Sequence, residues 1–118
     1  MKTSEVLTKA RGFIAQGFTK GTFARDVETN PTNALSTVAV CWCAHGAVLR
    51  ATESDQYMNT NDRPAESRAA ELKAIELLSD LVGMDVPEFN DDLNTTQEIA
   101  LEWFDKAIEK AKAKEAEG

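Results

Sequence analysis

Hydrophobic residues recur at helical spacing in four stretches of this chain. Apolar side chains three and four positions apart lie on one face of an α-helix, so each stretch predicts an amphipathic helix. We expect the first helix to begin at a cap from Thr3 or Ser4 and to end with Gly17 in the left-handed conformation. Its apolar face consists of Val6, Leu7, Ala10, Phe13 and Ile14.

Residues 34–52 fit two structures. Val38, Val40 and Trp42 alternate as they would in a strand. A helical stripe also fits, and length favours it, because strands rarely exceed about ten residues. We therefore predict a helix here, capped by Asn33. The stripe consists of Leu35, Val38, Trp42, His45 and Leu49.

Residues 18–33 show no helical period and are interrupted by Gly21, Asn30 and Pro31. Within them, residues 22–27 fit either a short strand or an extended loop. Residues 53–63 are polar and predict a second loop.

The third predicted helix begins with Pro64 as its first residue and ends at Gly83. The fourth is predicted from a capping box in which Thr95 and Glu98 satisfy each other's backbone amides. We expect the charged residues 110–118 to form a frayed tail. The two apolar faces are Ala65, Ala69, Leu72, Ile75, Leu78 and Val82 in the third helix, and Ile99, Trp103, Phe104, Ala107, Ile108 and Ala111 in the fourth.

Four amphipathic helices bury their apolar faces most simply against one another. The sequence thus predicts a mainly α, small four-helix bundle-like domain over residues 1–118, with a short strand or hairpin in the 18–33 loop. Trp42 and Trp103 lie on apolar stripes and are expected in the core. Gly46, inside a predicted helix, indicates close approach by another backbone or an aromatic ring.

The negative charge of the chain is concentrated in one stretch. The formal net charge is −7, yet the residues outside 74–105 hold more basic than acidic side chains. Such a field influences the choice of partner rather than the fold. Between Lys73 and Lys106 there is no Lys or Arg but there are nine carboxylates, namely Glu76, Asp80, Asp85, Glu88, Asp91, Asp92, Glu98, Glu102 and Asp105.

Composition limits the kinds of partner that we expect and indicates the cellular compartment. An acidic chain does not favour direct nucleic-acid binding, which depends on Lys and Arg neutralising phosphates. The longest apolar run has seven residues, too few for a membrane span, and no signal-peptide core follows the N-terminus. Cys41 and Cys43 are poorly spaced for a disulfide, so reduced thiols and a cytoplasmic location are expected.

The sequence does not assemble a recognisable catalytic or metal centre. On a helix, Cys41 and His45 would share a face, but their neighbours are core-like, which favours packing over catalysis. The acidic residues 85–94 fit no frame of a calcium loop, and two cysteines with one histidine do not make a zinc site. We expect no cofactor and no metal.

Three short motifs together resemble an uncharacterised family of small bacterial and phage proteins, domain of unknown function 6197. The motifs are Ala24-Arg25-Asp26, Trp42-Cys43-Ala44-His45-Gly46-Ala47, and Phe89-Asn90-Asp91 followed by Phe104-Asp105-Lys106-Ala107-Ile108. Phe89 stands where the family tends to have tryptophan, and residues 92–94 replace a turn that usually carries Pro, Gly and Arg. The resemblance implies a polar cluster of Arg25, Asp26, Cys43, Asn90 and Asp91.

The leading hypothesis is a non-enzymatic acidic binding protein of the cytoplasm, such as a phage-type accessory or inhibitor protein, with a basic protein as its partner. One alternative is a small-ligand or nucleotide-binding module, or a weak enzyme, that uses the Arg/Asp/Asn cluster. Another is a structural or oligomeric protein, for instance a homodimer. The partner-binding residues of the leading hypothesis are Glu76, Asp80, Asp85, Glu88 and Asp92.

Overall fold

The computed structural model describes residues 2–52 and 65–117, so the predicted polar loop at 53–63 and Pro64 lie outside the described residues. Its elements follow in the order α1 (Thr3–Gln16), β1 (Ala24–Arg25), β2 (Pro31–Thr32), β3 (Cys41–Trp42), α2 (Ala44–Thr52), α3 (Ala65–Val82), α4 (Val86–Asp91) and α5 (Gln97–Ala116). The predicted mainly α domain with a short hairpin in residues 18–33 is confirmed.

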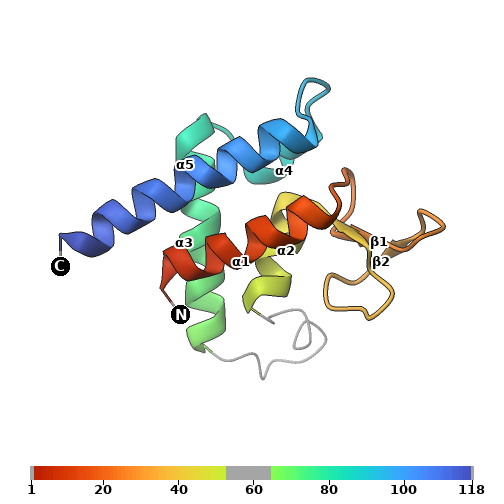
Figure 1. Cartoon of the computed structure of the whole chain (residues 1–118), viewed down its shortest axis with the longest axis horizontal. Helices are drawn as coiled ribbons and strands as arrows, with labels where there is room; N and C mark the ends of the chain where they lie inside the picture. The colour runs from red at the N-terminus through yellow and green to blue at the C-terminus, as the bar shows by residue number, and fades with distance from the viewer. Residues whose placement is uncertain (1, 53–64, 118) are drawn as a thin grey trace.

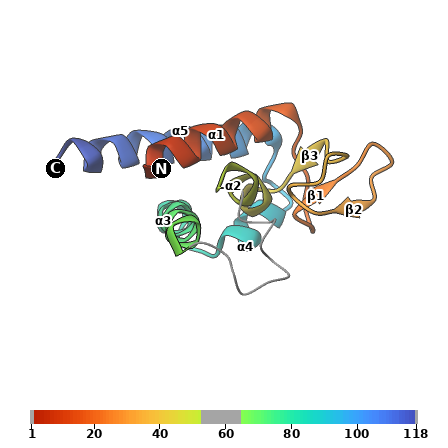
Figure 2. The same ribbon diagram turned by 90° about the horizontal axis from the view of Figure 1, so that it is seen from below.

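The helices form two layers (Figures 1 and 2). The antiparallel pair α1 and α5 makes one layer, and α2, α3 and α4 lie beneath it. The three short strands form an antiparallel sheet in the order β2-β1-β3 at one end of the helical body. None of the helices in the described residues is long and apolar enough to cross a membrane.

Both tryptophans are anchors of the core, as predicted. Trp42 is 2% exposed and Trp103 is 3% exposed. Each buried indole N–H donates to a backbone carbonyl, at 2.9 Å from Trp42 to Ala34 and at 2.9 Å from Trp103 to Leu78. Because neither indole leaves a donor unsatisfied, both rings are buried without a polar penalty.

The ends of α1 differ from the prediction. The cap residue is Lys2 rather than Thr3 or Ser4, and the Ser4 hydroxyl instead donates to Glu115 at 2.6 Å. Gly17 is extended, with φ −179°, and so is not left-handed. A side chain there is excluded by close packing, because a Cβ would lie 2.6 Å from the carbonyl oxygen of Val40.

The single helix predicted for residues 34–52 is wrong in its first half. Cys41 and Trp42 form β3, which pairs with β1 in the register Ala24 with Trp42. Asn33 caps no helix, and Val38 is 55% exposed, so it does not belong to a buried stripe. Strand pairing determines the backbone of this half, and the stripe is correct only from Ala44 onward.

Gly46 confirms the predicted close approach of another backbone. A Cβ on this residue would lie 2.0 Å from the carbonyl oxygen of Phe23. That carbonyl accepts the backbone N–H of Cys43 at 3.1 Å. The glycine therefore lets the first turn of α2 lie directly against the segment that leads into β1.

The two long helices of the second half lie where they were predicted, but α3 buries a different face from the predicted one. Of the predicted face, Ala65, Ala69 and Leu72 are exposed, and the buried residues of α3 are Glu71, Ala74, Leu77 and Leu78. Gly83 ends α3 in the left-handed conformation, with φ 69°. The short helix α4 was not predicted. Thr96, not Thr95, caps α5 by accepting the Ile99 N–H, while the Thr95 hydroxyl donates to Phe89. Residues 110–116, predicted to fray, are helical.

Candidate functional site

The acidic surface predicted for partner binding consists of exposed side chains on two consecutive helices. Two of them lie on the C-terminal half of α3, and the other three lie before, within and after α4. These helices are joined by a short turn and contact each other. The acidic surface consists of Glu76, Asp80, Asp85, Glu88 and Asp92.

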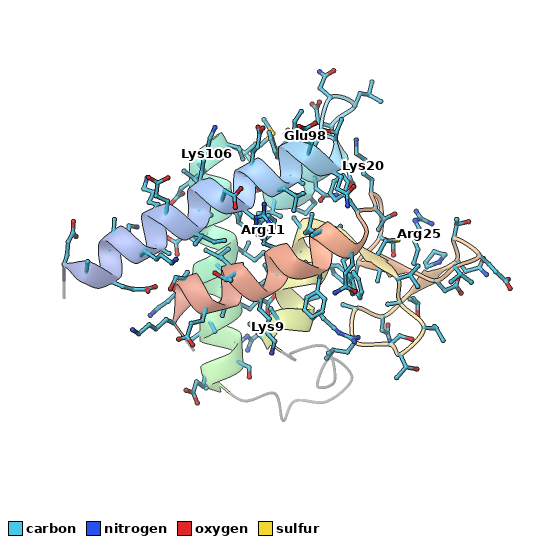
Figure 3. The ribbon with its side chains drawn as sticks, viewed as in Figure 1. Lys9, Arg11, Lys20, Arg25, Glu98 and Lys106 are labelled. Carbon is cyan, nitrogen blue, oxygen red and sulfur yellow. The ribbon has the colours of Figure 1, made fainter. Side chains whose placement is uncertain are left out.

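Basic side chains do not neutralise the acidic surface. In the described part of residues 73–106, Asp105 is the carboxylate that forms a salt bridge to Lys or Arg. Its Oδ1 atom lies 2.6 Å from Nε of Arg11. Arg11 lies between α1 and α5 (Figure 3). Lys20 comes near the acidic surface, but its ammonium donates to the Asp92 backbone carbonyl at 2.6 Å. None of the five carboxylates thus forms a salt bridge to a basic side chain of the described residues.

The charge is not uniform along the acidic surface. Glu76 and Asp80 line a groove of about 280 Å³ together with Lys73 and Lys114. Residues 85–92 instead contain four carboxylates and no basic residue. The carboxylates are therefore most concentrated around α4, where the Lys20 ammonium lies nearby.

Arg25 and Asp26 are engaged within their own loop. The Arg25 guanidinium donates to the Thr19 hydroxyl at 2.9 Å and to the carbonyls of Lys20 and Thr29. The Asp26 carboxylate accepts two backbone amides, of residues 28 and 30, at 2.9 and 3.0 Å. Both residues stabilise the turns around the sheet, where Figure 3 shows Arg25 well away from the helices. Neither lines the cavity described next.

The other three predicted cluster residues, Cys43, Asn90 and Asp91, line one cavity of about 310 Å³. Three segments far apart in the chain meet there: the residues before β1, the start of α2, and α4. Sequence reasoning alone did not find the contributions of Gly21, Thr22, Phe23, His45 and Pro87.

Asn90 joins the three segments. Its side chain is 1% exposed, and its oxygen accepts the Ala44 N–H at 2.8 Å, which satisfies the first amide of α2. Its amide donates to the Thr19 carbonyl at 3.2 Å and to the Asp91 carboxylate at 2.9 Å. The same oxygen of Asp91, Oδ1, also accepts the Gly21 N–H at 3.0 Å. These bonds give the cavity its shape.

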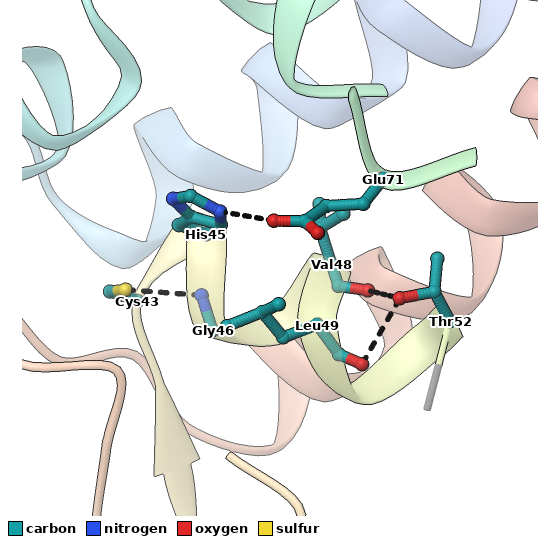
Figure 4. Close-up of polar contacts among 7 residues, drawn as sticks. All are labelled: Cys43, His45, Gly46, Val48, Leu49, Thr52 and Glu71. Carbon is teal, nitrogen blue, oxygen red and sulfur yellow. Dashed lines mark hydrogen bonds and ion pairs between the residues drawn. The ribbon is translucent and has the colours of Figure 1, made fainter. Parts of the chain in front are cut away.

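The Cys43 thiol is structural. Its sulfur accepts the Gly46 N–H at 3.2 Å, directly before α2 (Figure 4). Burial raises the pKa of this thiol above 9.0, and the lowering effect of the nearby backbone amides is smaller. A protonated, buried thiol is a poor nucleophile. Cys41 lies in β3, so the predicted helical Cys41–His45 face does not exist.

His45 and Glu71 form a pair that the sequence analysis missed. The His45 Nε2 atom lies 2.8 Å from a Glu71 carboxylate oxygen, and so links α2 to α3 (Figure 4). The His45 ring also contacts Phe23 edge-on, with ring centroids 5.5 Å apart. The two residues are separated by 26 positions, and no motif connects them. Among the described residues, no three potential ligands are grouped to hold a metal ion.

Comparison with known proteins places this chain in a family of unknown function. The model of a family described as "Family of unknown function (DUF6197)" matches residues 1–110. The chain therefore belongs to this family. No curated protein and no solved structure matches it.

Phe89, in the motif where the family resemblance leads us to expect tryptophan, has a packing role. Its ring meets Trp103 edge-on with centroids 4.6 Å apart. This contact fixes α4 on α5 and thereby positions the neighbouring Asn90. After α4, Leu93 is 97% exposed in the turn that precedes α5.

Proposed function

We propose that this protein is a non-enzymatic binding protein that engages a basic protein partner through its acidic surface, in the manner of an accessory or inhibitor protein of a phage or bacterium. The observation that carries the proposal is the exposure of all five carboxylates without a salt bridge to a basic side chain of the described residues.

The physical basis of the proposal is the summed field of these carboxylates. An uncompensated patch of one sign steers an oppositely charged partner and selects against partners of like charge. The part around α4 contributes most, because four carboxylates lie within residues 85–92. Such binding weakens as salt shortens the screening length.

The state of the polar side chains near the cavity favours binding over catalysis. The Cys43 thiol has a raised pKa, and Asn90 is occupied by three hydrogen bonds. A nucleophile needs a lowered pKa or a base within reach. As part of the same proposal the protein acts in the cytoplasm, which its two free cysteines support.

The test compares two variants that carry the same change of net charge. The first neutralises the acidic surface with Glu76→Gln, Asp80→Asn, Glu88→Gln and Asp92→Asn. The control neutralises four exposed glutamates elsewhere, with Glu28→Gln, Glu102→Gln, Glu109→Gln and Glu117→Gln. Each protein is used in pull-downs, and the retained proteins are identified by mass spectrometry.

We expect the wild type and the control to retain the same basic proteins, and the acidic-surface variant to lose them. Raising the salt from about 0.1 M to about 1 M shortens the screening length from about 10 Å to about 3 Å and should release them from the wild type. Undiminished retention by the acidic-surface variant, or retention that salt does not change, would refute the proposal.

A further inference from the structure

The cavity and the acidic surface share one helix. From α4, Pro87, Asn90 and Asp91 line the cavity, while Glu88 of the same helix is exposed on the acidic surface. A partner held on the acidic surface at α4 would therefore lie close to this cavity.

The polar groups that the cavity offers to a ligand are mainly acceptors. Asn90 is committed to the fold, and Asp91 Oδ1 already accepts two N–H groups. Among the described residues, the Asp91 Oδ2 atom and the Thr22 hydroxyl have no hydrogen-bond partner. A carboxylate oxygen accepts only, so the cavity favours a ligand that carries several donors and a positive charge.

Flat side chains form the remaining walls. The Phe23 ring, 37% exposed, packs against His45, and Pro87 is exposed at the cavity. An exposed aromatic face attracts a cation. The volume of about 310 Å³ is at the small end of the range for ligand sites, about 300–1,000 Å³. It suits one side chain better than a large cofactor.

We propose that this cavity receives an arginine side chain of the basic partner. The guanidinium would donate to Asp91 Oδ2 and to the Thr22 hydroxyl while its face stacks on Phe23. Lysine fits less well, because its compact ammonium neither stacks nor presents a planar fork of donors. The inference rests on the proposed function and adds a residue preference to it.

The test uses two peptides of equal length and charge, eight arginines and eight lysines, titrated into the full chain and into three variants by fluorescence anisotropy. Asp91→Asn removes the charge in the cavity, and Thr22→Val removes the hydroxyl at almost constant shape. Glu88→Gln is the matched control, because it makes the same charge change as Asp91→Asn on the same helix but outside the cavity. Thermal melts establish that each variant is folded.

The wild type should bind the arginine peptide about tenfold more tightly than the lysine peptide, since lysine lacks both the second donor of the fork for Thr22 and the stacking on Phe23. Asp91→Asn and Thr22→Val should each reduce the preference, and Glu88→Gln should weaken both peptides equally. If Asp91→Asn does not fold, Thr22→Val alone decides.

Equal affinity of the wild type for both peptides, or an arginine preference unchanged in Thr22→Val, would overturn the assignment of the cavity and leave the acidic surface intact. Binding of neither peptide would overturn the proposed function as well. A titration with arginine amide tests whether the cavity takes a free small molecule or an arginine that belongs to a partner protein. If arginine amide binds as tightly as the arginine peptide, an arginine held by a partner is contradicted.

Discussion

The Cys43 thiol experiences two opposing influences at the start of α2. Backbone amides, the largest effect coming from Gly46, lower its pKa, and burial raises it. Burial is the larger effect, so the pKa is raised above 9.0 and the thiol is protonated at neutral pH.

This balance predicts how stability depends on pH. The pKa of Cys43 is raised in the folded state, so the folded protein favours the protonated thiol. The contribution of this thiol to the free energy of unfolding is therefore fully present below the unfolded pKa of 9.0, and it is lost as the pH rises through the folded pKa. Cys43→Ser keeps a cap for α2 but does not ionise in this range. We expect the free energy of unfolding, measured with urea on both sides of pH 9.0, to fall less steeply in Cys43→Ser than in the wild type. Identical slopes would contradict this description.

At the scale of elements, the beginning of α2 depends on contacts from elsewhere in the chain. Asn90 accepts the Ala44 amide, and Phe23 accepts the Cys43 amide. Gly46 makes the second contact possible, because a side chain there would overlap the Phe23 carbonyl. The hydrogen atom that glycine has in place of a methyl group at this position therefore allows both the start of α2 and one wall of the cavity to form.

Alanine substitutions at two glycines test this dependence. Gly46→Ala should destabilise the fold by about 3 kcal/mol or more, because the atom it meets belongs to the backbone and cannot rotate away. Gly12→Ala is the matched control, since a Cβ there has nothing within 4 Å and Gly12 is exposed on α1. It should stabilise by about 1 kcal/mol through helix propensity. Chemical denaturation measures both, and similar effects at the two sites would contradict the packing described at Gly46.

Whether an element could be predicted from the sequence depends on whether local periodicity or contacts from distant residues determine it. Periodic apolar residues predicted the existence of α1, α3 and α5, but they gave the wrong buried face for α3, in which Leu72 is exposed and Ala74 and Leu77 are buried. They gave the wrong start for α2, since the pairing of Cys41 with Arg25 and the capping by Asn90 depend on residues 16 and 46 positions away. The six-residue helix α4 is too short to show a period.

At the scale of the whole molecule, the two ends of the chain are joined. The Glu115 carboxylate accepts both the hydroxyl and the backbone N–H of Ser4, at 2.6 and 3.1 Å. These bonds hold the last turns of α5 beside the start of α1 (Figure 1), which accounts for the helical end of a segment predicted to fray. The predicted tail failed because its stabilising partner is 111 residues away.

The two parts of the candidate site differ in how far the sequence predicted them. Counting charges identified the five residues of the acidic surface, although their exposure and their lack of salt bridges needed the structure. The convergence of Cys43, Asn90 and Asp91 came only from the family resemblance, since nothing in their spacing brings them together. That resemblance also grouped Arg25 and Asp26 with them, which instead stabilise the loop around the sheet.

Chemical-shift mapping by NMR tests the central claim, that the uncompensated carboxylates around α3 and α4 form the binding surface. The full chain is titrated with the eight-lysine peptide, and the backbone amide shifts are followed in about 0.1 M and about 1 M salt. We predict shifts concentrated in residues 76–92 that disappear at the higher salt. Shifts centred on α1 or the C-terminal half of α5, or shifts that persist at the higher salt, would contradict it.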